Sequence, residues 1–254
     1  MSVKKTTSTS KISFDYNEMA EEIYQKLRLK YTPKLTPPLA IFTMGIPASG
    51  KSTSVINVLE KMRISKNSVI YLDPDEVMSE FPRYNNSLRG NNLKLFNKVG
   101  VIVAKKIFDK LVQEEISFVY FGTGKGFGHY RGMLSKTNKA GYTNALLNVM
   151  LNSDEAINRN SKRARSVGPD VIKNISASLK TGLSAPKYAR GKTPYEALRD
   201  LDFVNVVYDV DTSSNPPSIE LIKSNRNNSV FGKTKPKTKK RGRSAKKKVI
   251  KIKY

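Results

Sequence analysis

Short apolar runs alternate with longer amphipathic stretches over most of the chain. The run at residues 39–44 is bounded by proline and glycine, the pattern of a central parallel strand that is buried on both faces. We expect further strands at residues 69–72, 118–121, 144–150, 203–210 and 218–223. We expect helices at residues 15–31, 51–62, 93–115, 130–140, 153–163, 169–180 and 193–201. Because strands alternate with helices, the pattern predicts an α/β fold around a mainly parallel sheet.

The segment after the first expected strand has the sequence of a phosphate-binding loop. It fits G-x-x-x-x-G-K-[ST] at every fixed position, through residues Gly45, Ile46, Pro47, Ala48, Ser49, Gly50, Lys51 and Ser52. Glycines let successive backbone amides turn toward phosphates, and the following helix adds its positive N-terminal end. We expect Lys51 to reach the β- and γ-phosphates of ATP, Ser52 to bind Mg²⁺, and Thr53 to belong to the same nucleotide site. A buried strand before the loop and a helix after it argue against a chance glycine-rich turn, so the sequence predicts the three-layer P-loop NTPase fold.

Acidic residues follow the second expected strand, at the edge of the sheet where open α/β folds bind ligands. Asp73 or Asp75 could deprotonate a hydroxyl that attacks the γ-phosphate, or could hold Mg²⁺ through water. The alternative is that either carboxylate caps a helix that begins near Glu76. Position alone leaves both interpretations open.

Two further candidates lie at the same edge or beyond it. Thr123, after the third expected strand, could hydrogen-bond a substrate or could be a structural hydroxyl in a loop. Arg159 and Arg163 are four residues apart, which places them on one helix face, and Arg165 lies just beyond. Guanidinium groups so placed could clamp phosphates, although a solvated charged face has the same pattern. His129 is the only histidine, which excludes a histidine-pair metal site and favours a surface role.

Composition favours one folded domain, at residues 14–223, preceded by a flexible segment at residues 1–13. The absence of cysteine excludes disulfides, thiolate zinc sites and cysteine nucleophiles. No apolar stretch is long enough to span a bilayer, and the first residues lack the apolar centre of a signal peptide. We therefore expect a cytoplasmic or nuclear protein. Nothing in the sequence specifies an oligomeric state.

The net charge of +25 is concentrated at the C-terminal end of the chain. Fourteen lysines and arginines lie from Lys223 onward, and no Asp or Glu accompanies them. We expect residues 224–254 to form a disordered basic tail that neutralises the phosphates of a nucleic acid. A nuclear import signal, a solubilising tail and attraction to an anionic membrane surface are the alternatives.

Four segments together resemble the zeta-toxin family of P-loop kinases and, more distantly, polynucleotide and small-molecule kinases. They are GIPASGKS, YLDPDEVMSEFPRYN, FVYFGTGKG and INRNSKRARSVG, and the resemblance covers roughly residues 39–180. It implies Lys51 and Ser52 on ATP and Mg²⁺, Asp75 as the base that activates the acceptor hydroxyl, and Thr123 near the acceptor. It also implies Arg159 with Arg163 or Arg165 as lid residues on the phosphates. One departure is Phe121, where the family usually has a glutamate.

The resemblance implies a kinase that transfers the γ-phosphate of ATP to a hydroxyl, which in the family belongs to a nucleotide-sugar such as UDP-N-acetylglucosamine. The loss of the glutamate at Phe121 weakens the expectation of that substrate. One alternative is a polynucleotide 5′-hydroxyl kinase, to which the basic tail would supply substrate affinity. The other is a kinase-derived, catalytically weak protein that binds nucleic acid or belongs to a virion.

Overall fold

The structure is a computed structural model that describes residues 15–29, 31, 35–81, 84, 90–163, 166–182 and 191–224. The expected N-terminal segment 1–13 and Arg165 lie outside the described residues. The same holds for the basic tail except Ser224, which ends the last strand. Among the residues described, no helix is long and apolar enough to cross a membrane.

Six strands form one sheet in the order β2-β3-β1-β4-β5-β6. Their bounds are β1 Leu39–Met44, β2 Ile70–Leu72, β3 Phe118–Tyr120, β4 Thr143–Met150, β5 Val206–Asp211 and β6 Ser218–Ser224. The first five strands are parallel to their neighbours, and β6 alone pairs antiparallel, with β5. The predicted mainly parallel α/β sheet is therefore confirmed.

The helices occupy the expected segments with small differences at their ends. They are α1 Tyr16–Arg28, α2 Lys51–Lys61, α3 Pro74–Ser79, α4 Gly90–Gln113, α5 Phe127–Lys139, α6 Ser153–Ser161, α7 Pro169–Lys180 and α8 Pro194–Arg199, with a 3₁₀ turn η1 Lys66–Ser68. The helix expected near Glu76 begins earlier, because Pro74 occupies its first turn and Asp73 caps it. The expected helix at 153–163 ends at Ser161, so the prediction that Arg163 shares a helix face with Arg159 was wrong.

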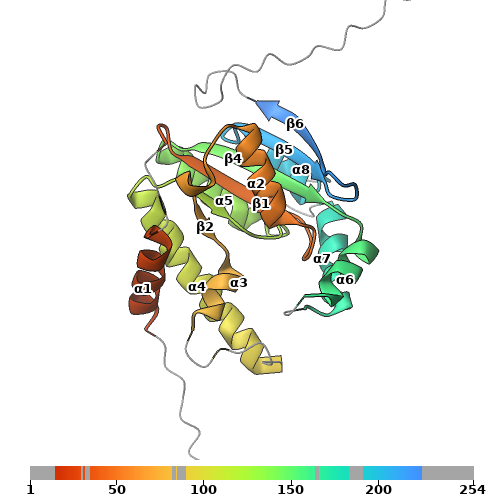
Figure 1. Cartoon of the computed structure of the whole chain (residues 1–254), viewed down its shortest axis with the longest axis horizontal. Helices are drawn as coiled ribbons and strands as arrows, with labels where there is room; N and C mark the ends of the chain where they lie inside the picture. Colours follow the sequence, from red (N-terminus) through yellow and green to blue (C-terminus); the bar gives the residue numbers. More distant parts are fainter. Residues whose placement is uncertain are drawn as a thin grey trace, which may run out of the picture.

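Alternating side chains of the strands pack in two hydrophobic cores, one on each face of the sheet. Ala40 and Phe42 of β1 pack in the larger core, which α1, α4 and α5 cover. Leu39 and Ile41 point to the other face, where α2 supplies the covering residues. Figure 1 shows α2 over one face of the sheet and α5 behind the other, with α1 and α4 beside β2. These are the three layers that the sequence predicts.

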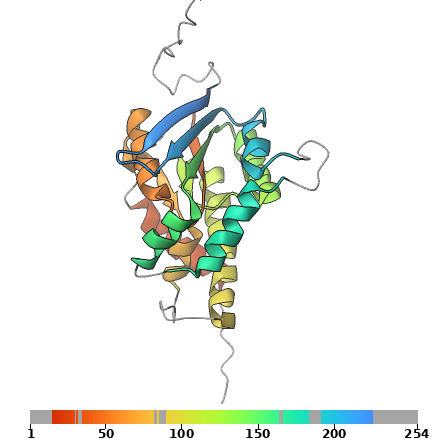
Figure 2. The ribbon, with the colours of Figure 1, turned by 90° about the vertical axis from the view of Figure 1, so that its right-hand side faces the viewer.

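A third, smaller hydrophobic cluster joins the phosphate loop to α6 and α7. Ile46 of the loop is buried with Ala156 of α6 and with Ile172 and Ile175 of α7. The two helices lie side by side, facing the viewer in Figure 2. This cluster holds α6, which carries Arg159, against the loop.

Candidate active site

The phosphate loop between β1 and α2 has the backbone conformation that its glycines permit. Gly45 has φ 136°, and a Cβ there would lie 2.4 Å from the carbonyl oxygen of Val149. Gly50, at the start of α2, has φ 84°, in the left-handed region that favours glycine. The amide of Gly45 donates to the carbonyl of Thr123 at 3.1 Å, which ties the loop to the segment after β3. The fixed glycines of the motif are therefore required sterically at these positions.

Lys51 is folded back onto its own loop. Its Nζ donates to the carbonyl oxygens of Ile46 at 2.8 Å and Gly45 at 3.1 Å. Burial lowers the pKa of this ammonium to about 8; nearby Arg163 also lowers it, whereas the charges of Asp73 and Asp75 raise it. The Lys51 ammonium thus donates to carbonyl oxygens of the loop, and a phosphate would be a stronger acceptor.

Asp73 combines a structural contact with proximity to Lys51. Its carboxylate accepts the amide of Asp75 at 2.9 Å and caps α3, as the capping interpretation expected. Burial raises its pKa to about 6, the Asp75 amide and Lys51 act in the opposite direction, and the charges of Asp75 and Glu76 raise the pKa further. Asp75 itself is exposed in the first turn of α3. Both carboxylates therefore lie within electrostatic reach of Lys51, at the carboxyl edge of the sheet.

Arg159 is held beside the phosphate loop. Its Nη2 donates to the carbonyl of Thr212 at 2.6 Å and forms an ion pair with Glu155, one turn earlier in α6. Its Nη1 lies 4.0 Å from the position that a Cβ would take on Gly50. Arg163 is exposed beyond the end of α6, yet its charge acts on the pKa of Lys51. The structure thus places both arginines near the loop, and Arg159 does not lie on a purely solvated face.

Thr212 is a residue of this site that sequence reasoning missed. It follows β5, is 6% exposed, and donates from its hydroxyl to the carbonyl of Ser49 at 2.9 Å. It lies 163 residues from Ser49 in the sequence and belongs to no recognisable motif. No sequence signal pointed to it.

The segment after β3 approaches the phosphate loop closely. Thr123 is half-buried, and its carbonyl accepts the Gly45 amide described above. Next to it, Gly122 faces the hydroxyl of Tyr130, which would lie 2.1 Å from a Cβ at position 122. That hydroxyl donates to the carbonyl of Thr43, the penultimate residue of β1, at 2.7 Å. Thr123 contacts the loop through its backbone carbonyl, and a substrate role for its side chain stays a prediction.

The side chain of Phe121 lies in the core between the sheet and α2. It is 7% exposed, and its ring stacks on Tyr71 with centroids 6.3 Å apart and an interplanar angle of 21°. A carboxylate at this position would enter an apolar layer, which disfavours its charged form.

The single histidine, His129, is exposed, as expected, and its ring lies beside that of Tyr120 with centroids 6.3 Å apart. Partial burial, and the nearby charge of Lys105, lower its pKa.

The donor groups near the loop fit a magnesium ion that is held mostly by phosphates and water. Ser52 is exposed in the first turn of α2, and Asp73 lies near the Lys51 ammonium. No group of three or more His, Cys, Asp or Glu side chains gathers anywhere in the described part of the chain. Mg²⁺ in kinase sites takes one or two protein oxygens together with substrate phosphates and several waters. Ser52 directly, and Asp73 through water, meet that requirement.

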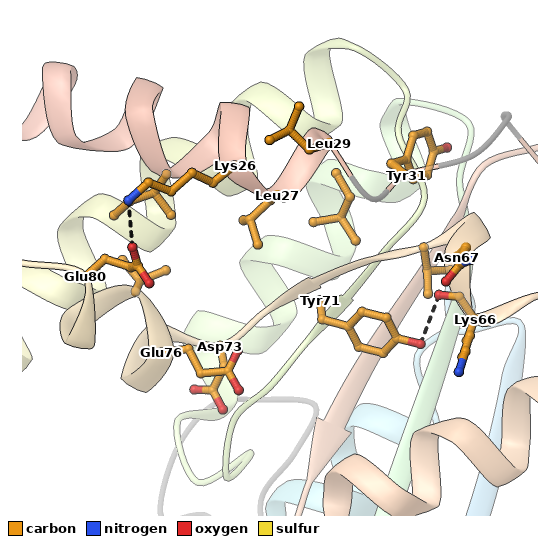
Figure 3. Close-up of a pocket in the computed structure, with 14 residues that line it drawn as sticks. Lys26, Leu27, Leu29, Tyr31, Lys66, Asn67, Tyr71, Asp73, Glu76 and Glu80 are labelled. Carbon is orange, nitrogen blue, oxygen red and sulfur yellow. Dashed lines mark hydrogen bonds and ion pairs between the residues drawn. The ribbon is translucent and has the colours of Figure 1, made fainter.

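A separate cavity of about 590 Å³ follows the outer edge of β2, between α1 and α3 (Figure 3). Its walls are largely apolar, and the Lys26–Glu80 ion pair, at 2.8 Å, lies at one side. At the other end the hydroxyl of Tyr71 donates to the carbonyl of Lys66 at 3.0 Å. No residue of the phosphate loop lines this cavity, and it meets the nucleotide site only through Asp73. The cavity is therefore distinct from the candidate nucleotide site.

Comparisons with known proteins bear on the fold and on the family. No curated protein matches the sequence. A structure from the PezAT chromosomal toxin–antitoxin system of the human pathogen Streptococcus pneumoniae is similar to the chain, with a TM-score of 0.61, 12% identity and 87% of each chain covered. A structure of AvrRxo1-ORF1:-ORF2 with ATP has a TM-score of 0.55 and 10% identity, and covers 80% of this chain and 65% of that chain. At these identities the likeness shows the fold alone.

The family of the chain is identified from its sequence. The profile of the zeta toxin family matches residues 22–185, a span that begins in α1 and ends beyond α7. It contains the phosphate loop, Asp73, Asp75, Thr123 and Arg159. The chain therefore belongs to the zeta-toxin family, and its fold is that of the P-loop kinases.

Proposed function

We propose that the protein is an ATP-dependent kinase that transfers the γ-phosphate to a hydroxyl of a nucleotide-sugar or another small molecule. The observation that carries this proposal is the convergence of three kinds of group at one sheet edge. The phosphate loop supplies amides and Lys51, the end of β2 supplies Asp73 and Asp75, and α6 supplies Arg159. Asp75, exposed at this edge and within electrostatic reach of Lys51, is the group that could accept the proton of an acceptor hydroxyl.

In the proposed reaction Asp75 accepts the proton of the acceptor hydroxyl as its oxygen attacks the γ-phosphorus. The bond from the γ-phosphorus to the β–γ bridging oxygen breaks, and ADP carries that oxygen away. Lys51, Arg159 and Arg163 offset the negative charge that develops on the phosphoryl oxygens and the leaving oxygen. The catalytic contribution of the chain is thus one proton transfer together with electrostatic positioning.

Magnesium fits this site as described above, with Ser52 and Asp73 as the residues that would hold it. When bound, it would supply charge neutralisation on the β- and γ-phosphates. Asp73 has a pKa of about 6 because it is buried, so it is largely ionised at neutral pH and available for that role. Its cap on α3 at the same time fixes the position of Asp75, two residues later.

Phe121 bears on which acceptor the site recognises. Phe121 stands where the zeta-toxin family usually has a glutamate, and its side chain lies in an apolar layer. One carboxylate that the family has at this edge is therefore missing. This supports an acceptor whose recognition differs from that of the family substrate.

The decisive experiment offers γ-labelled ATP with Mg²⁺ to the full chain, together with nucleotide-sugars in one arm and 5′-hydroxyl oligonucleotides in another. Label transfer to a nucleotide-sugar or another small hydroxyl compound supports the proposal, and Lys51→Ala and Asp75→Ala should abolish it. Transfer only to oligonucleotides would replace it with the polynucleotide kinase. ATP binding without transfer to any acceptor would favour the catalytically weak, kinase-derived protein.

We also propose that the basic segment 224–254 binds nucleic acid. Its support is the concentration of fourteen cations without an acidic residue from Lys223 onward. Removing residues 225–254 should abolish most binding to duplex DNA or RNA at moderate salt, as measured by fluorescence anisotropy. Unchanged binding would place the affinity in the folded domain. A nuclear or virion location, which the segment would favour, can be read from the tagged full-length protein.

A further inference from the structure

Thr212 connects the phosphate loop to the end of β4. Its hydroxyl lies 2.9 Å from the carbonyl oxygen of Ser49 and 3.1 Å from that of Met150, and donates to them. Its backbone amide donates to the Met150 carbonyl as well, at 3.1 Å. A hydroxyl has one proton, so both acceptors share it and none is left for a ligand. The contacts of this side chain are therefore directed at the backbone of the site.

The contact with Ser49 acts on a peptide unit inside the loop. In a planar trans peptide the carbonyl and the following amide point in opposite directions. Drawing the Ser49 carbonyl toward Thr212 turns the Gly50 amide to the opposite side of the loop, and amides of such a loop bind phosphate. The Thr212 methyl carbon lies 3.6 Å from the position of a Cβ on Gly50, so the side chain also packs against this backbone.

The same residue fixes the arginine. The Thr212 carbonyl accepts a hydrogen bond of 2.6 Å from Arg159 Nη2, while Glu155 contacts the same nitrogen. The other nitrogen, Nη1, is directed to the vicinity of Gly50. One buried residue thus contacts both the phosphate loop and Arg159, the two groups that would hold the phosphates.

We propose that Thr212 is a positioning residue that aligns the phosphate loop and Arg159 on one nucleotide. The inference deepens the proposed function and rests on it. Without the hydroxyl, the Ser49–Gly50 peptide loses the hydrogen bond that orients its carbonyl, and the segment after β5 loses one contact with the loop. Nucleotide affinity and phosphoryl transfer then fall, although every residue that would touch the nucleotide is still present.

The test compares Thr212→Val, which has the same shape without the hydroxyl, with Thr212→Ser, which keeps the hydroxyl without the methyl. The matched control is Thr137→Val in α5. That residue is also fully buried and donates its hydroxyl, to Asn144 Oδ1 at 2.6 Å and to carbonyls of its own helix, away from the loop. All four proteins, including the unmodified chain, are measured for ATP affinity by calorimetry, for kcat and KM, and for hydrogen exchange of the amides at residues 46 and 48–52 without nucleotide.

We expect Thr212→Val to weaken ATP binding about tenfold, to lower kcat/KM about 10- to 100-fold, and to speed exchange of the loop amides. Thr212→Ser should restore most of each value, and Thr137→Val should lower the unfolding temperature without changing loop exchange. Equal loop exchange and equal ATP affinity in Thr212→Val and the unmodified chain would overturn the inference. If the unmodified chain binds no ATP, the proposed function fails, whereas loop exchange still decides whether Thr212 positions the loop.

Discussion

The Nζ of Lys51 donates to the carbonyl oxygen of Ile46 at 2.8 Å, so the lysine of the phosphate loop binds the loop itself. A nucleotide has to replace these carbonyl contacts with phosphate oxygens. Charged acceptors form stronger hydrogen bonds than neutral ones, which makes the exchange favourable as long as the lysine is protonated. The protonation of Lys51 therefore links nucleotide binding to pH.

We predict that ATP binding takes up about three-quarters of a proton at pH 8.5. The pKa of Lys51 is about 8 in the free protein because of burial, and bound phosphates raise it. The ammonium is therefore half lost at pH 8 without nucleotide, and affinity should fall up to about tenfold per pH unit above that value. Calorimetry in two buffers of different ionisation enthalpy measures the uptake. Lys51→Arg, which stays charged, should bind without it, and equal uptake in both proteins would contradict the assignment.

Asp75→Asn should remove phosphoryl transfer and leave nucleotide binding intact. The exposed carboxylate is the proposed base, and a positioned base typically contributes about 10²- to 10⁴-fold to the rate. We expect kcat to fall by that factor while the Kd for ATP changes less than about twofold. Glu76→Gln, an exposed acid in the same turn of α3, is the matched control and should stay active. A comparable loss of kcat in the control would show that charge in this turn matters, and not a specific base.

Asp73→Asn should stabilise the fold at neutral pH. The pKa of Asp73 is raised from 3.8 to about 6 by burial, so between these values the folded protein holds a proton that the unfolded chain releases. The free energy of unfolding therefore falls as pH rises from about 4 to 6. Asparagine keeps the capping oxygen without the charge, and should raise the free energy of unfolding at pH 7 by ~2 kcal/mol.

Urea unfolding at pH 4, 5, 6 and 7 measures this effect. The control is Asp170→Asn, an exposed acid in the first turn of α7, which should not change the pH profile between pH 5 and 7. If Asp73→Asn is less stable than the unmodified chain at pH 7, then the contact of Asp73 with its surroundings outweighs its burial.

Gly122→Ala should destabilise the protein through Tyr130. A Cβ at position 122 would lie 2.1 Å from the hydroxyl oxygen of Tyr130 and 3.2 Å from the ring carbon that bears it. Because that hydroxyl is bound to the Thr43 carbonyl, we expect a loss of about 1 to 3 kcal/mol in the free energy of unfolding. The alanine should cost less in a Tyr130→Phe background, where the nearest atom is gone. Full additivity of the two changes in a double-mutant cycle would show that the clash does not occur.

The control for this prediction is Gly132→Ala, inside α5. A Cβ at this exposed position meets nothing within 4 Å. Alanine favours the helix there by about 0.5 to 1 kcal/mol, so the free energy of unfolding should rise. A loss in this variant as well would indicate that α5 tolerates no added side-chain volume.

Periodicity predicted most of the fold because the elements follow local rules. The run at Leu39–Met44 is a strand within its predicted bounds, and α7 spans Pro169–Lys180 as expected. Errors fell at the ends of elements: the strand expected to begin at residue 203 begins at Val206, and several helix ends differ as well. Because of Pro74 and Asp73, α3 begins earlier in the chain than expected, and α6 ends before Arg163. The start of α3 depends on one proline and one side-chain cap, which a hydrophobic pattern does not carry.

The sequence alone determined the phosphate loop, because its glycines, Lys51 and Ser52 are adjacent in the chain and each is required by local backbone geometry or by phosphate chemistry. It also placed Asp73 and Asp75 at the correct edge, since parallel strands end on the same side of a sheet. Only the tertiary structure decided that Arg159 is held beside Gly50, that Phe121 faces an apolar layer, and that Thr212 anchors the loop. The reason is that these contacts join residues many tens of positions apart, and their geometry depends on how the helices and the sheet pack together.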